Sequence, residues 1–217
     1  LEFFLARALL RAVQDDAPPE LFPDALARPP LSPEVCQFMA DLMHAWKRED
    51  AVRDAIHRVL LADYHPQASE NALRLGYRLD RQGRPTGQPA PYIPEGARLH
   101  GARLAFEDLD SIRLPGADLR EAELLATRLA HADLGAARLD EANLDQANLE
   151  GAILNGASLV GAQLANASLA GAQAKVRAVG AVGGQAKLPV AEVGRLTAVF
   201  DAMATPLGLR VVTVSPD

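Results

Sequence analysis

The chain has 217 residues and a formal net charge of −6, with 49% hydrophobic and 5% aromatic residues. No segment is strongly basic, which argues against a direct nucleic-acid binder. No apolar run approaches the roughly 18 residues of a membrane span, so we expect no membrane contact. The single cysteine, Cys36, cannot form a disulfide within the chain. We therefore expect a reducing, cytoplasmic compartment.

Amphipathic patterns predict a small α-helical subdomain over residues 1–76. Ser32 is expected to cap a helix that begins with Pro33, because serine favours the N-cap and proline the first turn. Its predicted buried stripe is Val35, Phe38, Met39, Leu42, Met43 and Trp46. The other predicted helices cover residues 1–14, 50–62 and, as a shorter helix or turn, 69–75. In the helix over 50–62, we expect Val52, Ala55, Ile56, Val59 and Leu60 to face inward.

The first nine residues, LEFFLARAL, resemble a helix near the end of NACHT-type signalling NTPases. In those proteins the helix follows the nucleotide-binding module, and a repeat domain often comes next. This resemblance implies that the subdomain is the end of a larger upstream module. The alternative is an ordinary amphipathic helix.

Residues 77–95 are rich in proline and glycine and are interpreted as a linker and an N-terminal cap, in which Tyr92 and Ile93 cover the first coil of the following repeat. Residues 175–217 are predicted to form a C-terminal cap. This cap would contain a helix over 189–203 and a strand over 209–214, because repeat arrays need atypical end units.

Between these segments, a leucine recurs at every fifth position. A period of five fits neither a continuous helix nor a strand, so the chain must turn about once in five residues. The repeated leucines, which we expect to form the structural core, are Leu99, Leu104, Leu109, Leu114, Leu119, Leu124, Leu129, Leu134, Leu139, Leu144, Leu149, Leu154, Leu159, Leu164 and Leu169.

A small residue usually stands two positions before each leucine, and a polar residue stands between them. The pattern A-(D/N)-L-x-x is clear at Ala117–Leu119 and Ala147–Leu149. With it, residues 96–174 resemble the pentapeptide-repeat family. The resemblance implies a right-handed, quadrilateral parallel β-helix with four pentapeptides in each coil of 20 residues.

A coil of 20 residues predicts that residues 20 positions apart stack on one another. Opposite charges then lie next to each other, as in Asp108 with Arg128 and Asp118 with Arg138, and such pairs stabilise neighbouring strands. Glu107 is the exception, because it occupies a position expected to hold buried alanine. We therefore expect the first coil to be distorted or to open towards the N-terminal segment.

Candidate reactive groups do not form a convincing active site. There is no phosphate-binding loop, and the five histidines, His44, His57, His65, His100 and His131, lack a second ligand at metal spacing. Cys36 is interpreted as a buried structural residue, and the adjacent carboxylates Asp108 and Asp110 as part of an acidic surface. We expect no metal and no cofactor, and we do not expect this chain to be an enzyme.

Three functions remain open. The first is a non-catalytic protein-interaction or ligand-sensing repeat region of a bacterial NACHT-like signalling or defence NTPase, with a protein partner. The second is a DNA mimic that binds a type II topoisomerase, as some pentapeptide-repeat proteins do. The third is an enzyme with a site between the helices and the first coil, which Glu107 alone supports. The possible interaction surface is Glu121, Glu141, Asp145 and Glu150.

Overall fold

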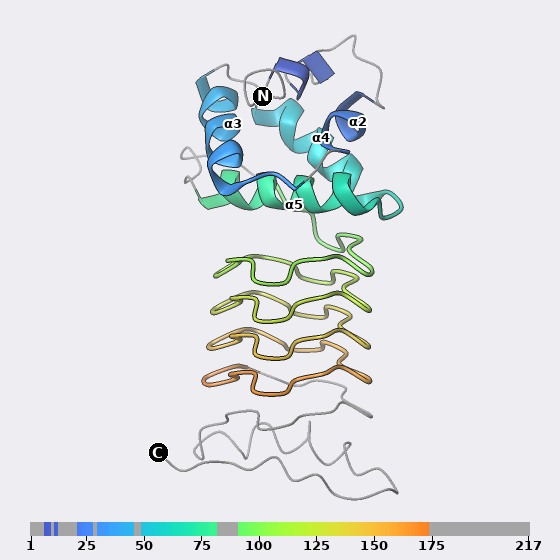
Figure 1. The fold of residues 1–217 in the computed structure, drawn as a ribbon, viewed down its shortest axis with the longest axis vertical. Coiled ribbons are helices and arrows are strands. Elements are labelled where there is room, and N and C mark those ends of the chain that lie inside the picture. The colour runs from blue at the N-terminus through green and yellow to red at the C-terminus, as the bar shows by residue number, and fades with distance from the viewer. Residues whose placement is uncertain are drawn as a thin grey trace, which may run out of the picture. The chain divides into compact units, whose positions relative to one another are not determined.

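The computed structural model describes residues 7–9, 11–12, 21–27, 30–45, 49–81 and 91–173. They fall in two compact units, Leu1–Arg98 (unit 1) and Leu99–Asp217 (unit 2) (Figure 1). The predicted helix and strand beyond residue 174 lie outside the described residues. Within the described ranges, no helix has both the length and the apolar character that are needed to cross a membrane.

Unit 1 contains helices α2 (Leu21–Leu26), α3 (Pro33–Ala45), α4 (Glu49–Leu61) and α5 (Pro66–Arg81). The Ser32 hydroxyl accepts a hydrogen bond from the Val35 amide at 3.3 Å, which confirms the predicted cap of α3. Phe38, predicted to be buried in α3, is 37% exposed, so that detail of the stripe is wrong. The residues that α4 buries are the predicted ones, Val52, Ala55, Ile56, Val59 and Leu60.

Helix α5 is the central helix of unit 1, because α2, α3 and α4 each pack against it. The sequence predicts a short helix or turn over 69–75 and a linker from residue 77. A helix is present at 69–75, but it is longer than predicted, and its end at Arg81 replaces the first residues of the predicted linker. The helix buries residues around most of its circumference, including the polar Ser69, Glu70 and Asn71. Its apolar residues Ala68, Ala72, Leu75 and Leu79 recur at the spacing of an amphipathic helix, so the sequence does indicate a helix longer than 69–75, although the polar Ser69, Glu70 and Asn71 lie within it.

The buried Asn71 side chain connects α5 to the chain between α2 and α3. Its Oδ1 accepts a hydrogen bond from the Leu31 amide, and its Nδ2 donates to the Leu26 carbonyl, both at 2.9 Å. Two backbone groups that would otherwise be buried without partners are thus satisfied by one side chain.

Tyr92 and Ile93 are buried in unit 1, where the Tyr92 amide donates to the Asp80 carboxylate at 3.2 Å. The His57 ring nitrogen Nε2 donates to the Pro91 carbonyl at 2.9 Å. Burial raises the pKa of the Tyr92 hydroxyl to about 12, because the phenolate would lose its hydration. Both residues therefore contribute to the core of unit 1, and their predicted role as a cap for the repeats stays a prediction.

The described part of unit 2 is a solenoid of five-residue turns. After each of the fifteen leucines, the amide three positions on donates to the leucine carbonyl, as in Ala142 to Leu139 at 3.1 Å. The second residue after each leucine has a positive φ, between 53° and 77°, as the third residue of a type II turn does. Nine of these fifteen positions, from residue 101 to residue 171, hold a residue other than glycine.

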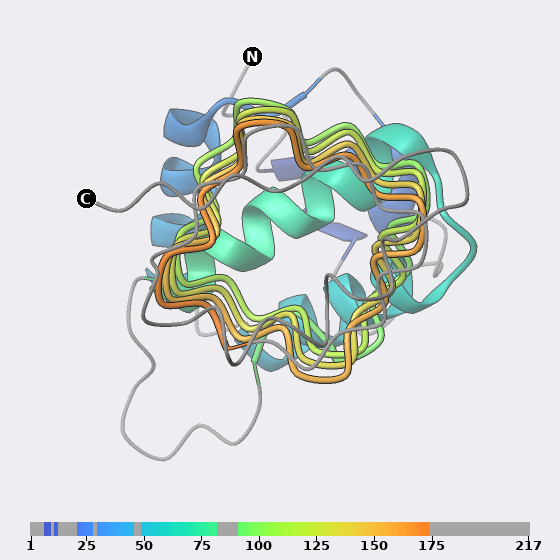
Figure 2. The same cartoon turned by 90° about the horizontal axis from the view of Figure 1, so that it is seen from below.

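Successive coils are joined by a parallel ladder in which each bridge links residues 20 apart, from Arg103 with Glu123 to Ile153 with Gln173. The Leu119 amide donates to the Arg138 carbonyl at 2.8 Å, and the Arg138 amide donates to the Ala117 carbonyl at 2.8 Å. Viewed along the solenoid, the coils therefore superimpose (Figure 2). This confirms the predicted register of four turns per coil. Each side of a coil contributes a single bridged residue rather than a strand of several residues, because the turns take up the remaining residues.

All fifteen leucines are buried, with exposures of 4% or less. Thr127, which replaces an inward alanine, is also buried, and its hydroxyl donates to the Leu104 carbonyl at 2.7 Å. Glu107 is half-buried, and its carbonyl accepts the regular ladder bond from the Arg128 amide at 2.9 Å. The predicted distortion of the coil at Glu107 is therefore wrong, because its backbone keeps the common geometry while its side chain is partly exposed. The alternative, that this coil opens towards the N-terminal segment, stays a prediction.

Candidate interaction surface of the solenoid

Where an aspartate or asparagine stands directly before a leucine, its side chain has a structural role that explains the A-(D/N)-L pattern. Its side-chain oxygen accepts a hydrogen bond from the amide two residues further on, which forms an Asx turn. The five examples are Asp108 with Asp110, Asp118 with Arg120, Asp133 with Gly135, Asn143 with Asp145 and Asn148 with Glu150, at 3.1 to 3.4 Å. Much of the polar character of the surface thus supports the turns.

Aspartates just after a leucine supply the same kind of acceptor to the next coil. Asp110 accepts from the Ala130 amide at 2.9 Å, where the residue before the leucine is an arginine. In the same way, Asp140 accepts from Val160 at 3.1 Å and Asp145 from Ala165 at 2.7 Å. These aspartates connect coils, because they satisfy amides that have no Asx turn of their own.

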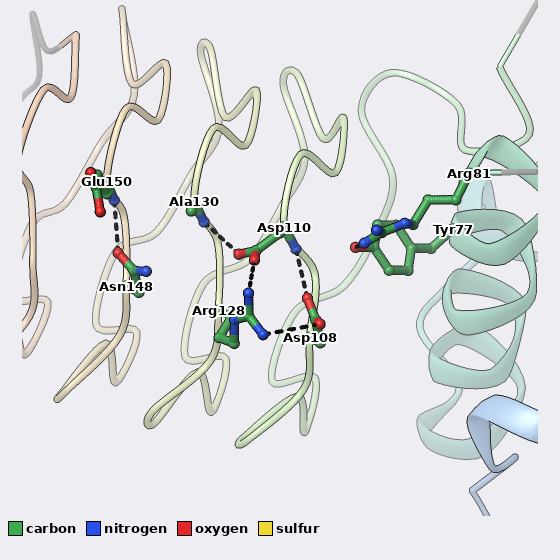
Figure 3. Close-up of polar contacts among 8 residues, drawn as sticks. All are labelled: Tyr77, Arg81, Asp108, Asp110, Arg128, Ala130, Asn148 and Glu150. Carbon is green, nitrogen blue, oxygen red and sulfur yellow. Dashed lines mark hydrogen bonds and ion pairs between the residues drawn. The ribbon is translucent and has the colours of Figure 1, made fainter. Parts of the chain in front are cut away.

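Figure 3 shows how Asp108 and Asp110 hold Arg128 of the next coil. The Arg128 guanidinium donates to Asp108 at 3.3 Å and forms a second ion pair with Asp110. This confirms the predicted pairing of Asp108 with Arg128. The two carboxylates therefore join the first coil to the second through Arg128. This agrees with their interpretation as surface groups rather than a catalytic pair.

Asp118 has a different partner from the predicted one. Arg120 of the same coil donates to both of its carboxylate oxygens, at 2.7 and 2.6 Å. These hydrogen bonds hold the pKa of Asp118 below its ordinary value, and Arg138 of the next coil adds a weaker favourable charge. The predicted direct pair with Arg138 is thus replaced, because a bidentate arginine bond within the coil has better geometry.

The four predicted interaction residues do not form one patch. Glu121 and Glu141 are exposed and occupy the same corner of successive coils, with the Glu121 amide bonded to the Asp140 carbonyl at 2.9 Å. Asp145 and Glu150 follow on the next two sides of the coil, because each side takes five residues. Among the described residues, the Glu141 and Glu150 side chains make no hydrogen bond or ion pair, whereas Asp145 is used in the ladder.

Phe106 is an exposed residue that the sequence analysis missed. It occupies a corner of the first coil with φ 64°, and 75% of it is exposed. A bulky residue with positive φ is uncommon. The five-residue period places it at an outer corner, because it is the second residue after Leu104, but the pattern of charges gives no signal for it.

The candidate reactive groups remain scattered. Cys36 is buried in α3, and His100 lies 3.7 Å from the Glu121 carboxylate as an exposed pair. Within the described ranges, no three histidine, cysteine or acidic side chains are grouped so that they could hold a metal ion. The contacts of these groups are those of structural and surface residues.

Eight copies of the pentapeptide-repeat family model match residues 97–135 and 142–174. The crystal structure of alr5209, a pentapeptide repeat protein from Nostoc PCC 7120, is similar, with 31% identity. The match covers 43% of this chain and 69% of that chain, with a TM-score of 0.36. The chain belongs to the pentapeptide-repeat family.

Two other solved structures of pentapeptide repeat proteins are similar over shorter shares of their length. Rfr23 from the cyanobacterium Cyanothece 51142 is 36% identical, over 46% of this chain and 65% of that chain, with a TM-score of 0.31. HetL from Nostoc PCC 7120, involved in heterocyst differentiation regulation, is 31% identical, over 42% of this chain and 55% of that chain, with a TM-score of 0.24. No curated protein matches the chain. Pentapeptide-repeat proteins form right-handed quadrilateral β-helices and are generally non-enzymatic, so this chain is a structural repeat protein.

Proposed function

We propose that the solenoid is a rigid, non-catalytic module that binds a protein partner through its outer surface. One observation carries the proposal. The interior is filled by leucine and alanine, while exposed side chains such as Glu141 and Glu150 make no hydrogen bond or ion pair among the described residues. Side chains that folding does not use are available for recognition. We also propose that the coils have the right-handed wind of the family.

Affinity capture from an extract of the source organism tests this function. The full chain is compared with a variant that combines Glu121→Gln, Glu141→Gln and Glu150→Gln, with circular dichroism to verify that both are folded. We expect the wild type to retain at least one protein that the variant releases or binds more weakly. Identical retention by both chains, or no retention by either, would contradict the proposal.

The topoisomerase alternative is less well supported by the contacts. A DNA mimic needs a continuous negative stripe, but Asp108, Asp110 and Asp118 are neutralised by arginines, and Asp140 and Asp145 bond to backbone amides. We expect the purified chain to leave gyrase supercoiling unchanged at micromolar concentration. Inhibition or protection of gyrase would favour the alternative.

The finer proposal, that this module serves a NACHT-like NTPase, rests on the resemblance of residues 1–9 alone. The structure describes only residues 7–9 of that segment, and they are helical. The sequence that precedes Leu1 in the gene tests the idea. A nucleotide-binding module there is the expected result, and any other kind of domain would contradict it.

A further inference from the structure

The backbone conformation of Phe106 is unfavourable for a residue other than glycine, and its side chain contributes little to the stability of the fold. Its backbone is in the left-handed region, with φ 64°, which glycine adopts without strain. Three quarters of the residue is exposed, so it buries little apolar surface in return. A partner that covers the ring would explain why an aromatic residue stands at this corner.

Other apolar residues surround Phe106 on the same side of the solenoid. Its amide donates to the Leu125 carbonyl of the next coil at 2.9 Å, and Leu125 is only half-buried. Ala105 and Ala126 lie beside them in the 20-residue register, and they are half-buried as well. An exposed aromatic ring next to partly exposed aliphatic groups is typical of the centre of a protein interface.

Carboxylates border these apolar residues in the second and third coils. Glu121, Glu123 and Glu141 are exposed, and Asp145 is half-buried. Between residues 121 and 126 and between 141 and 146 the chain has no basic residue. In the first coil, Arg103 is the ladder neighbour of Glu123, and His100 lies 3.7 Å from the Glu121 carboxylate. We define the Phe106 surface as Ala105, Phe106, Leu125 and Ala126 with Glu121, Glu123 and Glu141, because Asp145 bonds to the Ala165 amide of the next coil.

We propose that the Phe106 surface binds a protein segment in which an apolar side chain is flanked by lysine or arginine residues. This inference rests on the proposed interaction function and names the chemistry of the partner. The apolar side chain would cover Phe106 and Leu125, and the basic groups would face the carboxylates. Nucleic acids and anionic membranes are disfavoured as occupants, because the carboxylates would repel their phosphates.

Random 12-residue peptides displayed on phage provide the probe, and they are selected against the full chain. We expect the enriched peptides to combine at least two basic residues with a large apolar residue. Affinities of the best peptide are then measured by calorimetry for the wild type, Phe106→Gly and Ser111→Gly. Ser111 is the matched control, because it is an exposed corner residue of the same coil with the same φ of 64°.

The expected result is a loss of affinity of about 30-fold or more for Phe106→Gly, as for a central aromatic contact, and no loss for Ser111→Gly. The thermal midpoints of both variants should be unchanged or higher, because glycine relieves the strained φ. The double variant with Glu121→Gln and Glu141→Gln should bind more weakly and with less dependence on salt.

Four results would overturn the proposal. Enriched peptides without basic residues would contradict the charge argument. Peptides that bind equally well to Phe106→Gly would place the interface on another side and leave the proposed function standing, whereas no enriched peptide would count against both. A dimer in analytical ultracentrifugation that Phe106→Gly dissociates would make a second copy of the chain the occupant.

Discussion

Unit 1 and the solenoid build their interiors in different ways. In unit 1, the Asn71 side chain bonds to backbone groups at Leu31 and Leu26, and the His57 and Asp80 side chains bond to the backbone at other places, so each of these contacts is different. In the solenoid, each leucine carbonyl accepts the same turn hydrogen bond as the next one, from the amide three residues on. Stability is therefore concentrated in a few contacts in unit 1 and distributed over many equal contacts in the solenoid.

The largest effect is expected inside the solenoid, from Leu139→Ala in the third coil. The leucine is fully buried between coils, and its removal leaves a cavity, so we expect a loss of about 3–5 kcal/mol in the free energy of unfolding. Chemical denaturation measures this loss. The neighbouring outward change Arg138→Ala is the control and should cost less than about 0.5 kcal/mol. Similar losses for both variants would contradict an interior lined by leucine.

A slightly smaller effect is expected in unit 1 from Asn71→Ala. This change leaves the Leu31 amide and the Leu26 carbonyl without the partner that the structure gives them, at a cost of about 2–4 kcal/mol. Asn148→Ala in the solenoid removes a single acceptor at the surface and should cost about 1 kcal/mol or less. Equal costs in the two units would remove the contrast between concentrated and distributed stability.

The sequence predicts the solenoid far better than unit 1 for the same reason. Fifteen equivalent leucines report one geometry, so a deviation such as Thr127 or Glu107 does not disturb the register. Helix α5 has no repeat to reveal it, and its buried Asn71 and Glu70 look like surface residues in the sequence. Asn71 can be buried because it bonds to Leu31, which is 40 residues away in the sequence, and a local sequence pattern does not predict so distant a contact.

The surface could be predicted only in part. The 20-residue register correctly pairs Asp108 with Arg128, because the two residues are 20 positions apart in the sequence. It did not anticipate that Asp118 would bind Arg120 within its own coil, since that choice depends on side-chain conformation. Phe106 was not predicted as a surface residue, because its exposure follows from its position at a corner of the coil and the pattern of charges does not indicate that position.

A moderate effect is expected from Asp145→Ala, which removes the acceptor for the Ala165 amide of the next coil. We expect a loss of about 1–2 kcal/mol. Glu150→Ala is the matched change on the neighbouring side, where the side chain makes no contact of this kind among the described residues, and it should be nearly neutral. Denaturant titration of both variants distinguishes a carboxylate that joins coils from one that is available for a partner.

The smallest effect concerns the dependence of stability on pH at Asp118. Its folded-state pKa is lower than the ordinary value near 3.8, so its contribution is present above that value and is lost as the pH falls through the folded pKa. The wild type should be more stable than Asp118→Asn at pH 7 by less than about 1 kcal/mol, because the pair is partly exposed. Repeated denaturation at pH 3 should give a smaller difference, and a larger difference there would contradict the ion pair.

The 20-residue register is the central claim, because the interior, the coil contacts and the Phe106 surface all depend on it. Cysteines introduced by Asn148→Cys and Ser168→Cys replace a bridged pair of adjacent coils, whose separation of about 4.8 Å suits a disulfide. Cysteines from Ile153→Cys and Ser168→Cys, 15 residues apart, lie on different sides of the solenoid. After mild oxidation, mass spectrometry should detect a disulfide in the first variant and free thiols in the second. A disulfide between the residues 15 apart, or none between those 20 apart, would contradict the four-sided coil.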